Sequence, residues 1–405
     1  MAKKKAKSPS KTPPWSKTGA APIHAGAATQ KPRGTSGTSS AVSNNTKTNE
    51  KEILTTKKDE KEILTTKEEK KEVLKALRDG FGEGLMLAAK DDPNVVALSA
   101  DLTESNRMLE FKKAYPDRFV ETGIAEQNLV GLSAGMAHAG KVAFCASFAV
   151  FCPGRSWDQI RVSLCYSQAN VKIYGGHAGI TVGEDGATHQ ALEDIAITRV
   201  LPNMTVIVPA DAIEMRKATI AAAKMEGPVY LRGGREKLPM ATAEDTPFAI
   251  GKANVLRKGK NVTIIACGIM VHEALLAADE LARKKIDAQV IDLHTIKPID
   301  ENAILSAAHD TGAIVTAEEH QTTGGLGSAV AEVLAKNFPT PVEMVGVKDT
   351  FGESGTGQAL LDKYGLRAAN IVDAVKRALE RKKQHNVKRE TLKISAADIR
   401  KLKKR

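Results

Sequence analysis

The run KVAFCASFAVF, residues 141–151, is the clearest indication of the architecture of this chain. After Lys141 it contains only apolar residues, with the single exception of Ser147. A strand with one face in solvent alternates apolar and polar residues, whereas a near-continuous apolar run is typical of a strand buried on both faces. The run therefore favours a parallel sheet that is covered by helices on both sides.

Similar runs recur from about residue 70 onward, separated by segments with a helical pattern such as KEVLKALRDGFGEGLMLAAK, residues 71–90. Strands that alternate with helices along the chain are typical of α/β proteins with mainly parallel sheets. We therefore predict the α/β class. The other strand-like runs are NVVALSA (94–100), VKIYGG (171–176), MTVIVPA (204–210), PVYLR (228–232), NVTIIACG (261–268), AQVIDL (288–293), AIVTAEE (313–319) and VEMVGV (342–347).

One stretch interrupts this alternation. Residues 233–253 are polar and rich in turn-forming residues, and a new series of strands and helices begins at Asn261. A chain of 405 residues with 42% hydrophobic content is long enough for two cores. We therefore predict two domains, residues 70–245 and residues 250–380.

The two ends differ from the body in composition. Residues 1–49 hold nine Lys/Arg and no acid, with almost no large apolar side chains, so we predict a disordered basic extension. Residues 50–69 contain the sequence EKEILTTK twice and are predicted to be a charged helical lead-in. Residues 381–405 form a basic tail. Each end contributes +9 to the net charge of +11, which leaves the body at −7, so nucleic acid is an unlikely partner.

The chain carries no sign of a membrane or secretory location. It has no run of about 18 uncharged apolar residues, and no apolar segment follows the lysines of its first residues. Its four cysteines show no C-x-x-C spacing, which argues against a zinc site or a disulfide framework. We therefore expect a cytoplasmic, reducing compartment. The cysteines are Cys145, Cys152, Cys165 and Cys267.

Chemically active residue types follow several of the predicted strands. Asp101 and Ser105 lie in the loop after residues 94–100, and Phe148 and Phe151 lie at the end of the run 141–151. In parallel sheets, function gathers beyond the carboxyl ends of the strands. Taken alone, Asp101 is also consistent with a helix cap, and the two phenylalanines with core residues.

A further polar loop follows the run 171–176. It reads HAGITVGEDGATHQALED, residues 177–194, and contains His177, Asp185 and His189 among glycines. A glycine-rich loop with two histidines has little packing to do, which favours a functional role. Glu126, at the predicted start of a Gly/Ala-rich helix, is consistent either with this site or with a favourable helix-dipole contact. The pattern predicts one site without naming its chemistry.

Four motifs together resemble the C-terminal half of transketolase. They are SADLTESN (99–106), GIAEQN (123–128), GEDGATHQALED (183–194) and VIVPAD (206–211). The resemblance covers about residues 70–380 and keeps the order of the family. It implies a pyrimidine-binding domain followed by a Rossmann-like C-terminal domain, the latter expected mainly to stabilise assembly.

The resemblance implies thiamine diphosphate as cofactor. Glu126 matches the carboxylate that hydrogen-bonds the aminopyrimidine ring, and Phe148 and Phe151 match aromatic residues that stack on it. The third family aromatic falls at Gly154, so this part of the wall must be built differently here. Two further residues are expected near the cofactor, Asp101 and Leu102.

The resemblance also implies a substrate channel. His177 and His189 would contact sugar hydroxyls and assist proton transfer, because the ordinary pKa of imidazole, about 6.5, lies near neutrality. Asp185 would bind the 2-hydroxyl of the sugar. Three residues match positions that hold the sugar phosphate: Arg78, Ser105 and Arg235.

One family motif is missing. Transketolases bind the cofactor diphosphate and its metal through a Gly-Asp-Gly motif on a separate domain, and no such motif occurs here. We therefore expect a split enzyme in which an N-terminal partner subunit binds Mg²⁺ or Ca²⁺, while this chain contributes no metal ligand. A hetero-tetramer is the expected assembly. The implied reaction, of the pentose phosphate pathway, transfers a two-carbon ketol unit from xylulose 5-phosphate to ribose 5-phosphate.

Three alternatives compete with this hypothesis. Deoxyxylulose phosphate synthases share GEDGATH and GIAEQ but typically carry Asp at the position of His177. Pyruvate dehydrogenase beta-chains share the two-domain layout but lack this loop. A non-catalytic scaffold or regulatory subunit would need none of Glu126, His177, Asp185 and His189, so the presence of all four favours an enzyme.

Overall fold

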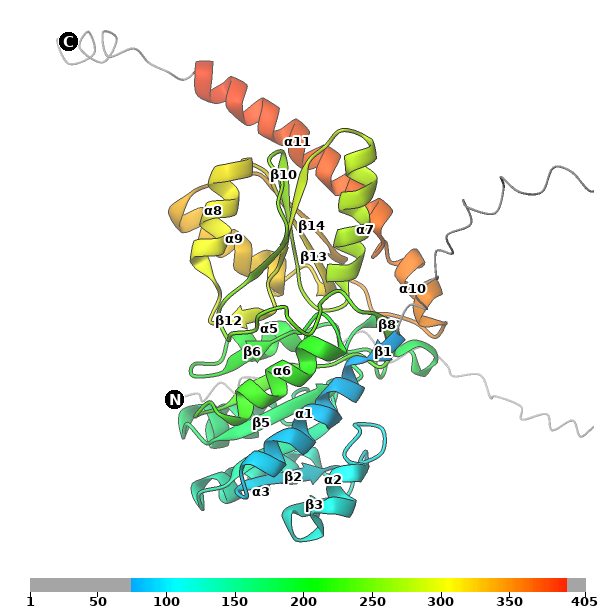
Figure 1. The fold of residues 1–405 in the computed structure, drawn as a ribbon, viewed down its shortest axis with the longest axis vertical. Helices are drawn as coiled ribbons and strands as arrows, with labels where there is room; N and C mark the ends of the chain where they lie inside the picture. The colour runs from blue at the N-terminus through cyan, green and yellow to red at the C-terminus, as the bar shows by residue number, and fades with distance from the viewer. Residues whose placement is uncertain (1–73, 392–405) are drawn as a thin grey trace, which may run out of the picture. The chain divides into compact units, whose positions relative to one another are not determined.

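A computed structural model of the chain describes residues 74–391, all of which belong to one compact unit by their contacts. The expectations for residues 1–49 and 50–69, and for residues 392–405 of the basic tail, lie outside the described residues. Two sheets organise the rest (Figure 1). The α/β class with mainly parallel sheets is confirmed.

The first sheet has seven strands in the order β12-β6-β7-β5-β4-β2-β3. Its strands are parallel except β12, which is antiparallel to β6. All seven residues of β4 are buried, as expected for a central strand covered on both faces. The strands are β2 (Val95–Ser99), β3 (Phe119–Glu121), β4 (Val142–Phe148), β5 (Val171–Gly176), β6 (Thr205–Ile207), β7 (Val229–Arg232) and β12 (Thr295–Lys297).

Helices cover both faces of this sheet. α1 (Leu77–Asp91) and α6 (Ala212–Ala223) share one hydrophobic core with it, and α3 (Glu126–His138) and the π-helix η2 (Ile160–Tyr166) share another. α1 and α6 lie so close that a Cβ at Gly80 would come within 2.1 Å of the Ala212 carbonyl oxygen. The shorter helices are α2 (Leu109–Ala114), η1 (Pro116–Arg118), α4 (Trp157–Gln159), η3 (Ile180–Asp185) and α5 (Asp194–Arg199).

The second sheet has five strands in the order β14-β13-β10-β11-β9, with only β9 antiparallel. Helices α7 and α11 cover one face, and α8 and α9 the other (Figure 1). Its elements are β9 (Asn254–Arg257), β10 (Val262–Ala266), α7 (Met270–Arg283), β11 (Ala288–Asp292), α8 (Glu301–Thr311), β13 (Ile314–Gln321), α9 (Leu326–Asn337), β14 (Val342–Val347), α10 (Gly357–Lys363) and α11 (Ala368–Thr391). Helix α11 continues beyond residue 380, so the first part of the predicted tail is helical.

The predicted helix over residues 71–90 is partly wrong. Leu74–Ala76 form the strand β1, which pairs antiparallel with β8 (Lys237–Pro239), a strand inside the stretch predicted as turns. The helix begins only after Ala76 because the Asp79 carboxylate accepts the Ala76 N–H at 3.1 Å and so fixes the first turn. The β1–β8 pairing links residues far apart in sequence, which local periodicity does not reveal.

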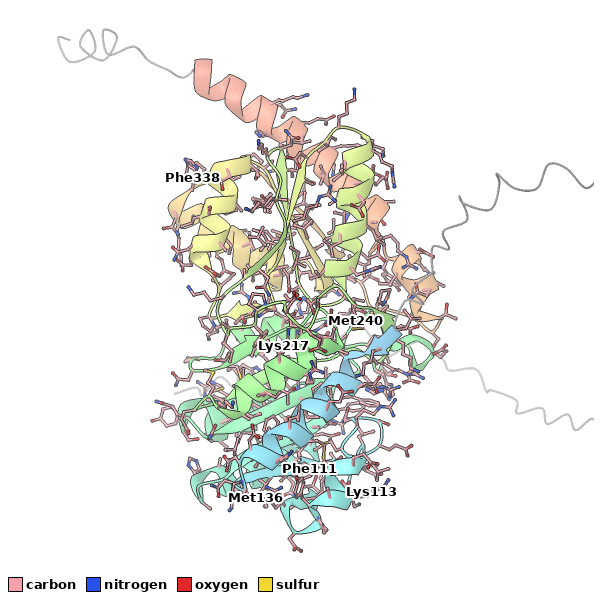
Figure 2. All side chains as sticks on the ribbon, viewed as in Figure 1. Phe111, Lys113, Met136, Lys217, Met240 and Phe338 are labelled. Atoms are coloured by element: carbon pink, nitrogen blue, oxygen red, sulfur yellow. The ribbon has the colours of Figure 1, made fainter. Side chains whose placement is uncertain are left out.

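The segment between the two sheets, residues 233–253, is hydrogen-bonded to both halves of the chain. Toward the second half, the Ala253 N–H donates to Asp300 at 3.1 Å. Lys217 on α6 donates from Nζ to the carbonyl oxygens of Ala243 (3.0 Å) and Thr246 (2.6 Å), and Figure 2 shows it where the two halves meet. β12 comes from the second half of the chain but adds to the first sheet, with Thr295 opposite Ile207. Within residues 74–391, no helix is long and apolar enough to cross a membrane.

Candidate active site

The candidate site lies at the carboxyl ends of four neighbouring parallel strands, β2, β4, β5 and β7. The loops that leave these ends carry most of the residues that the sequence singled out. Because all four strands run in the same direction, their ends meet at one edge of the sheet.

Two aromatic rings and two imidazoles form the centre of this edge. Phe148, the last residue of β4, stacks on His177 with ring centroids 3.9 Å apart. Phe151 lies 6.3 Å from Phe148, and His189 meets Phe151 edge-on at 5.3 Å. These four predicted residues therefore come together, although they come from two loops more than 20 residues apart.

His177 is the most constrained of them. It directly follows β5, has a positive φ of 52° and is 3% exposed, and its Nδ1 has no hydrogen-bond partner. Burial, together with the cations of Arg78, Arg235 and Arg107, lowers the pKa of His177 to about 3. The imidazole is therefore neutral at physiological pH, so the expectation drawn from the ordinary pKa of histidine does not hold for this residue.

Glu126 begins helix α3, as the sequence predicts, and is 2% exposed. Its Oε1 accepts a long hydrogen bond of 3.5 Å from the Ser147 hydroxyl. Its Oε2 is buried without a hydrogen-bond partner, and the guanidinium of Arg155 approaches to 3.6 Å. A buried carboxylate oxygen that accepts no hydrogen bond is costly for a fold unless a ligand completes it.

Arg155 occupies the part of the wall where the family pattern is broken. A Cβ at Gly154 would lie 1.9 Å from the Val150 carbonyl oxygen, so this backbone leaves no room for an aromatic side chain there. Instead the half-exposed guanidinium of Arg155 lies over the Phe151 ring, 4.6 Å from its centroid. Sequence reasoning missed Arg155, and its position directly after the substituted glycine was the available signal.

The two predicted phosphate-binding arginines are held by groups of this chain. Arg235 donates from Nη1 to the Val182 carbonyl at 2.7 Å and lies 3.5 Å from Glu184 and 3.8 Å from Asp185. Both ion pairs are partly exposed and are worth little in water. Arg235 and Asp185 are therefore side by side, as expected for residues of one channel.

Arg78 reaches the loop of Ser105, whose carbonyl oxygen accepts a hydrogen bond of 3.3 Å from Arg78 Nη1. Burial and the neighbouring Arg107 lower the pKa of Arg78. Arg107 was not predicted; its Nε pairs with Asp79 at 2.7 Å. Asn106 was also missed, although it is fully buried and both polar atoms of its side-chain amide lack partners.

Asp101 and Leu102 form hydrogen bonds to residues outside this group. The Asp101 N–H donates to Glu121 at 2.7 Å, and the Leu102 N–H donates to the Ser99 hydroxyl at 3.2 Å. Among the contacts of the described residues, none joins these two to the aromatic and imidazole rings. Asp101 caps no helix either, since α2 begins only at Leu109.

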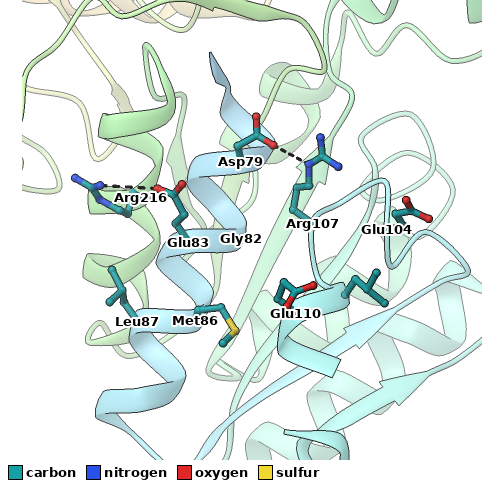
Figure 3. Close-up of a pocket in the computed structure, with 10 residues that line it drawn as sticks. Asp79, Gly82, Glu83, Met86, Leu87, Glu104, Arg107, Glu110 and Arg216 are labelled. Carbon is teal, nitrogen blue, oxygen red and sulfur yellow. Dashed lines mark hydrogen bonds and ion pairs between the residues drawn. The ribbon is translucent and has the colours of Figure 1, made fainter. Parts of the chain in front are cut away.

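One cavity lies elsewhere, between α1 and the loop of Arg107, and has a volume of about 620 Å³. Figure 3 shows two ion pairs in its lining, Asp79 with Arg107 and Glu83 with Arg216. None of the predicted site residues lines it.

In residues 74–391 no three His, Cys, Asp or Glu side chains are grouped to hold a metal, and the four cysteines are buried and free.

Two family models match the chain. Residues 75–240 match the transketolase pyrimidine-binding domain, and residues 251–371 match the transketolase C-terminal domain. Together they cover more than half of the chain.

Curated relatives agree with these matches. The 6-deoxy-6-sulfo-D-fructose transketolase subunit of Clostridium sp. (strain MSTE9) is 45% identical over 76% of this chain and 95% of its own length. A subunit of the apulose-4-phosphate transketolase of Phocaeicola vulgatus is 42% identical over 73% of this chain and 95% of its own length.

A solved structure has a similar fold. A split-gene transketolase, described as an inactive beta4 tetramer, is 50% identical and covers 75% of this chain and 98% of its own, with a TM-score of 0.71. The chain thus carries the pyrimidine-binding and C-terminal domains in their family order and is similar to subunits of split transketolases over nearly their full length; it belongs to the transketolase family.

Proposed function

We propose that this chain is the C-terminal subunit of a thiamine-diphosphate-dependent transketolase. It would transfer a two-carbon ketol unit from a ketose phosphate, such as xylulose 5-phosphate, to an aldose phosphate, such as ribose 5-phosphate. Thiamine diphosphate, when bound, supplies the carbon nucleophile that accepts and releases this unit.

The observation that carries the proposal is the open carboxylate oxygen of Glu126 near the aromatic ring of Phe151. Glu126 Oε2 is buried without a hydrogen-bond partner, and Phe151 lies nearby under the guanidinium of Arg155, which also approaches Glu126. A planar ring with an N–H donor fits such a place, as the aminopyrimidine does. Glu126 would hold a proton on the ring nitrogen, Phe148 and Phe151 would stack on the ring, and Asp101 and Leu102 would line the cofactor's edge.

The remaining residues are assigned to the substrate. His177, neutral and with a free Nδ1, would exchange hydrogen bonds with sugar hydroxyls, and His189 would share in proton transfer. Asp185 would bind the 2-hydroxyl. The phosphate would be held by Arg78, Ser105 and Arg235, whose guanidinium groups suit phosphate oxygens.

The names of the relatives do not determine which sugar this chain uses as donor. One is named for 6-deoxy-6-sulfo-D-fructose and another for apulose 4-phosphate, so the reaction class is the proposal and the donor is to be determined. The partner is proposed on similar grounds, since both relatives are described as subunits. The metal, Mg²⁺ or Ca²⁺, would be bound by that N-terminal subunit, in a hetero-tetramer.

The test is reconstitution. The purified chain is mixed with its candidate N-terminal subunit, thiamine diphosphate and Mg²⁺, and ketol transfer to ribose 5-phosphate is measured with xylulose 5-phosphate, 6-deoxy-6-sulfofructose and apulose 4-phosphate as donors. We expect the mixture of both subunits to be active with at least one of these donors and the chain alone to be inactive. The mixture that contains Glu126→Ala should lose this activity.

Cofactor binding is measured in parallel by circular dichroism. A mixture that binds the cofactor but transfers no ketol unit contradicts the transketolase proposal; if it instead condenses pyruvate with glyceraldehyde 3-phosphate, the synthase alternative is correct. A mixture that binds no thiamine diphosphate favours the scaffold alternative.

A further inference from the structure

The second half of the chain contacts the loop that carries His177. Glu319, on β13, accepts two hydrogen bonds at Oε1 from Thr181, one from the backbone N–H at 2.7 Å and one from the hydroxyl at 2.8 Å. The same carboxylate packs on Gly179, where a Cβ would lie 2.2 Å from Glu319 Cδ. Gly179 is thus required for this close approach, and Thr181 stands four residues after His177.

The other oxygen of the Glu319 carboxylate lies beside a buried cation. Its Oε2 faces the guanidinium of Arg232 at 3.8 Å, and Arg232 also donates to the Glu319 carbonyl at 2.8 Å. Burial raises the pKa of Glu319, while Arg232 and Thr181 oppose that rise. Thr181 and Arg232 both present donors to this side chain, so an amide nitrogen in the place of Oε2 would face the guanidinium of Arg232.

The loop is held partly by its own hydrogen bonds, such as that from the Gly179 N–H to the Ala191 carbonyl oxygen at 2.9 Å. His177 has a φ of 52° and Gly179 one of 90°, both in the left-handed region that most residues avoid. A second contact comes from Gln190, whose Nε2 donates to the carbonyl oxygens of Ile180 (3.1 Å) and Glu353 (2.9 Å). Glu353, like Glu319, belongs to the second half of the chain.

We propose that Glu319 is a positioning residue that fixes the His177 loop against Phe148 by accepting both hydrogen bonds of Thr181. The C-terminal half then acts on substrate binding as well as on assembly. This inference rests on the proposed function for its kinetic consequence, but its structural part does not.

The first measurement is hydrogen–deuterium exchange of peptides covering residues 178–184 in the free chain, which requires no activity. Glu319→Gln is compared with Glu318→Gln, a matched control on the same strand that is equally buried but accepts from Leu326 and Gly327 of its own half. We expect about tenfold faster exchange in Glu319→Gln alone. Equal exchange in the two variants overturns the proposal.

The second measurement is kinetic and uses the reconstituted complex. Glu319→Gln and Thr181→Val are each expected to raise the KM for the sugar donor about fivefold to tenfold with a smaller change in kcat, while Thr181→Ser, which keeps the hydroxyl, restores it. The double variant should lose no more than the worse single variant. Additive losses, or an equal loss in Glu318→Gln, contradict the positioning role. An inactive wild-type complex refutes the proposed function, while the exchange measurement still decides the role of Glu319.

Discussion

Each half of the molecule has a buried carboxylate at a helix N-terminus, Glu126 in the first half and Glu318 in the second. The two differ in how many of their oxygens accept hydrogen bonds. Glu318, on β13, accepts the Leu326 N–H at 2.7 Å and the Gly327 N–H at 2.8 Å, so both of its oxygens are used by helix α9. Glu126, at the start of α3, keeps Oε2 free of any hydrogen bond. The same chemical group is therefore structural where its bonding capacity is filled and available to a ligand where it is not.

The largest effect is expected from replacing the open carboxylate. Glu126→Gln should lower ketol transfer by the reconstituted complex at least about a hundredfold, because the amide cannot hold a proton on the cofactor ring. The free energy of unfolding of the free chain should change by less than about 1 kcal/mol, the size of a helix-dipole contact. Steady-state kinetics and urea unfolding measure the two quantities. A variant that loses stability and keeps activity would reverse the assignment.

The filled carboxylate should respond in the opposite way. Glu318→Ala leaves the N–H groups of Leu326 and Gly327 buried without acceptors, so we expect a loss of about 2–4 kcal/mol in the free energy of unfolding. Activity per folded molecule should stay within about twofold, since Glu318 does not contact the loop of His177. Urea unfolding followed by circular dichroism tests the first statement. If Glu318→Ala leaves the free energy of unfolding unchanged, Glu318 does not have the structural role that distinguishes it from Glu126.

A further pair of buried carboxylates, Glu214 and Asp292, lies between the two halves and is expected to make the stability of the chain depend on pH. Glu214 on α6 faces Asp292 on β11; burial raises the pKa of Glu214 to about 7, and burial with the neighbouring Glu214 raises that of Asp292 well above its ordinary range. Because the folded chain then binds protons more tightly than the unfolded chain, stability falls as pH rises from about 4.5 to about 7 and stays reduced above that.

Glu214→Gln removes the charge that causes this fall. We expect a gain of about 1–3 kcal/mol in the free energy of unfolding at pH 8 and a much smaller change at pH 4.5. Asp91→Asn, at an exposed position on α1, is the control and should leave the pH dependence unchanged. A gain of equal size at both pH values would mean that ionisation of Glu214 is not the cause.

The smallest effect concerns Arg155, the only cation described within 4 Å of Glu126. Its guanidinium lies on the Phe151 ring and beside Glu126, where the cofactor ring is proposed to bind, so we expect it to compete. Arg155→Met should tighten thiamine diphosphate binding by the complex about fivefold, in line with one weak ion pair and one cation–π contact. Arg161→Met, an exposed arginine on η2, is the control in a titration followed by circular dichroism. Weaker binding in Arg155→Met would instead make Arg155 part of the cofactor's wall.

The sequence predicts what is periodic and local. Each predicted apolar run contains a strand, because a strand that is buried on both faces has apolar residues at nearly every position. Helix α3 begins at Glu126, as expected. Five short strands escaped prediction, since each has only three or four residues and exists through pairing with another segment. They are β1, β3, β8, β9 and β12.

The same distinction applies to the candidate site. Phe148, Phe151, His177 and His189 follow the ends of recognisable strands, and the structure brings their rings together. Glu319 carries no local signal, because its contact to Thr181 joins residues 138 positions apart, and Arg155 is marked only by its place after Gly154. The low pKa of His177 likewise arises from burial and from arginines of three separate segments, which only the folded chain assembles.

Strand β12 has a consequence for how such a gene can be divided. A break between the two halves, near residue 250, would remove Thr295–Lys297 from β6 and leave that strand with an unpaired backbone at the edge of the sheet. An open edge strand is a template for pairing with other chains, so the isolated first half should aggregate rather than remain monomeric. The two halves of this chain are therefore expected to fold together and not separately.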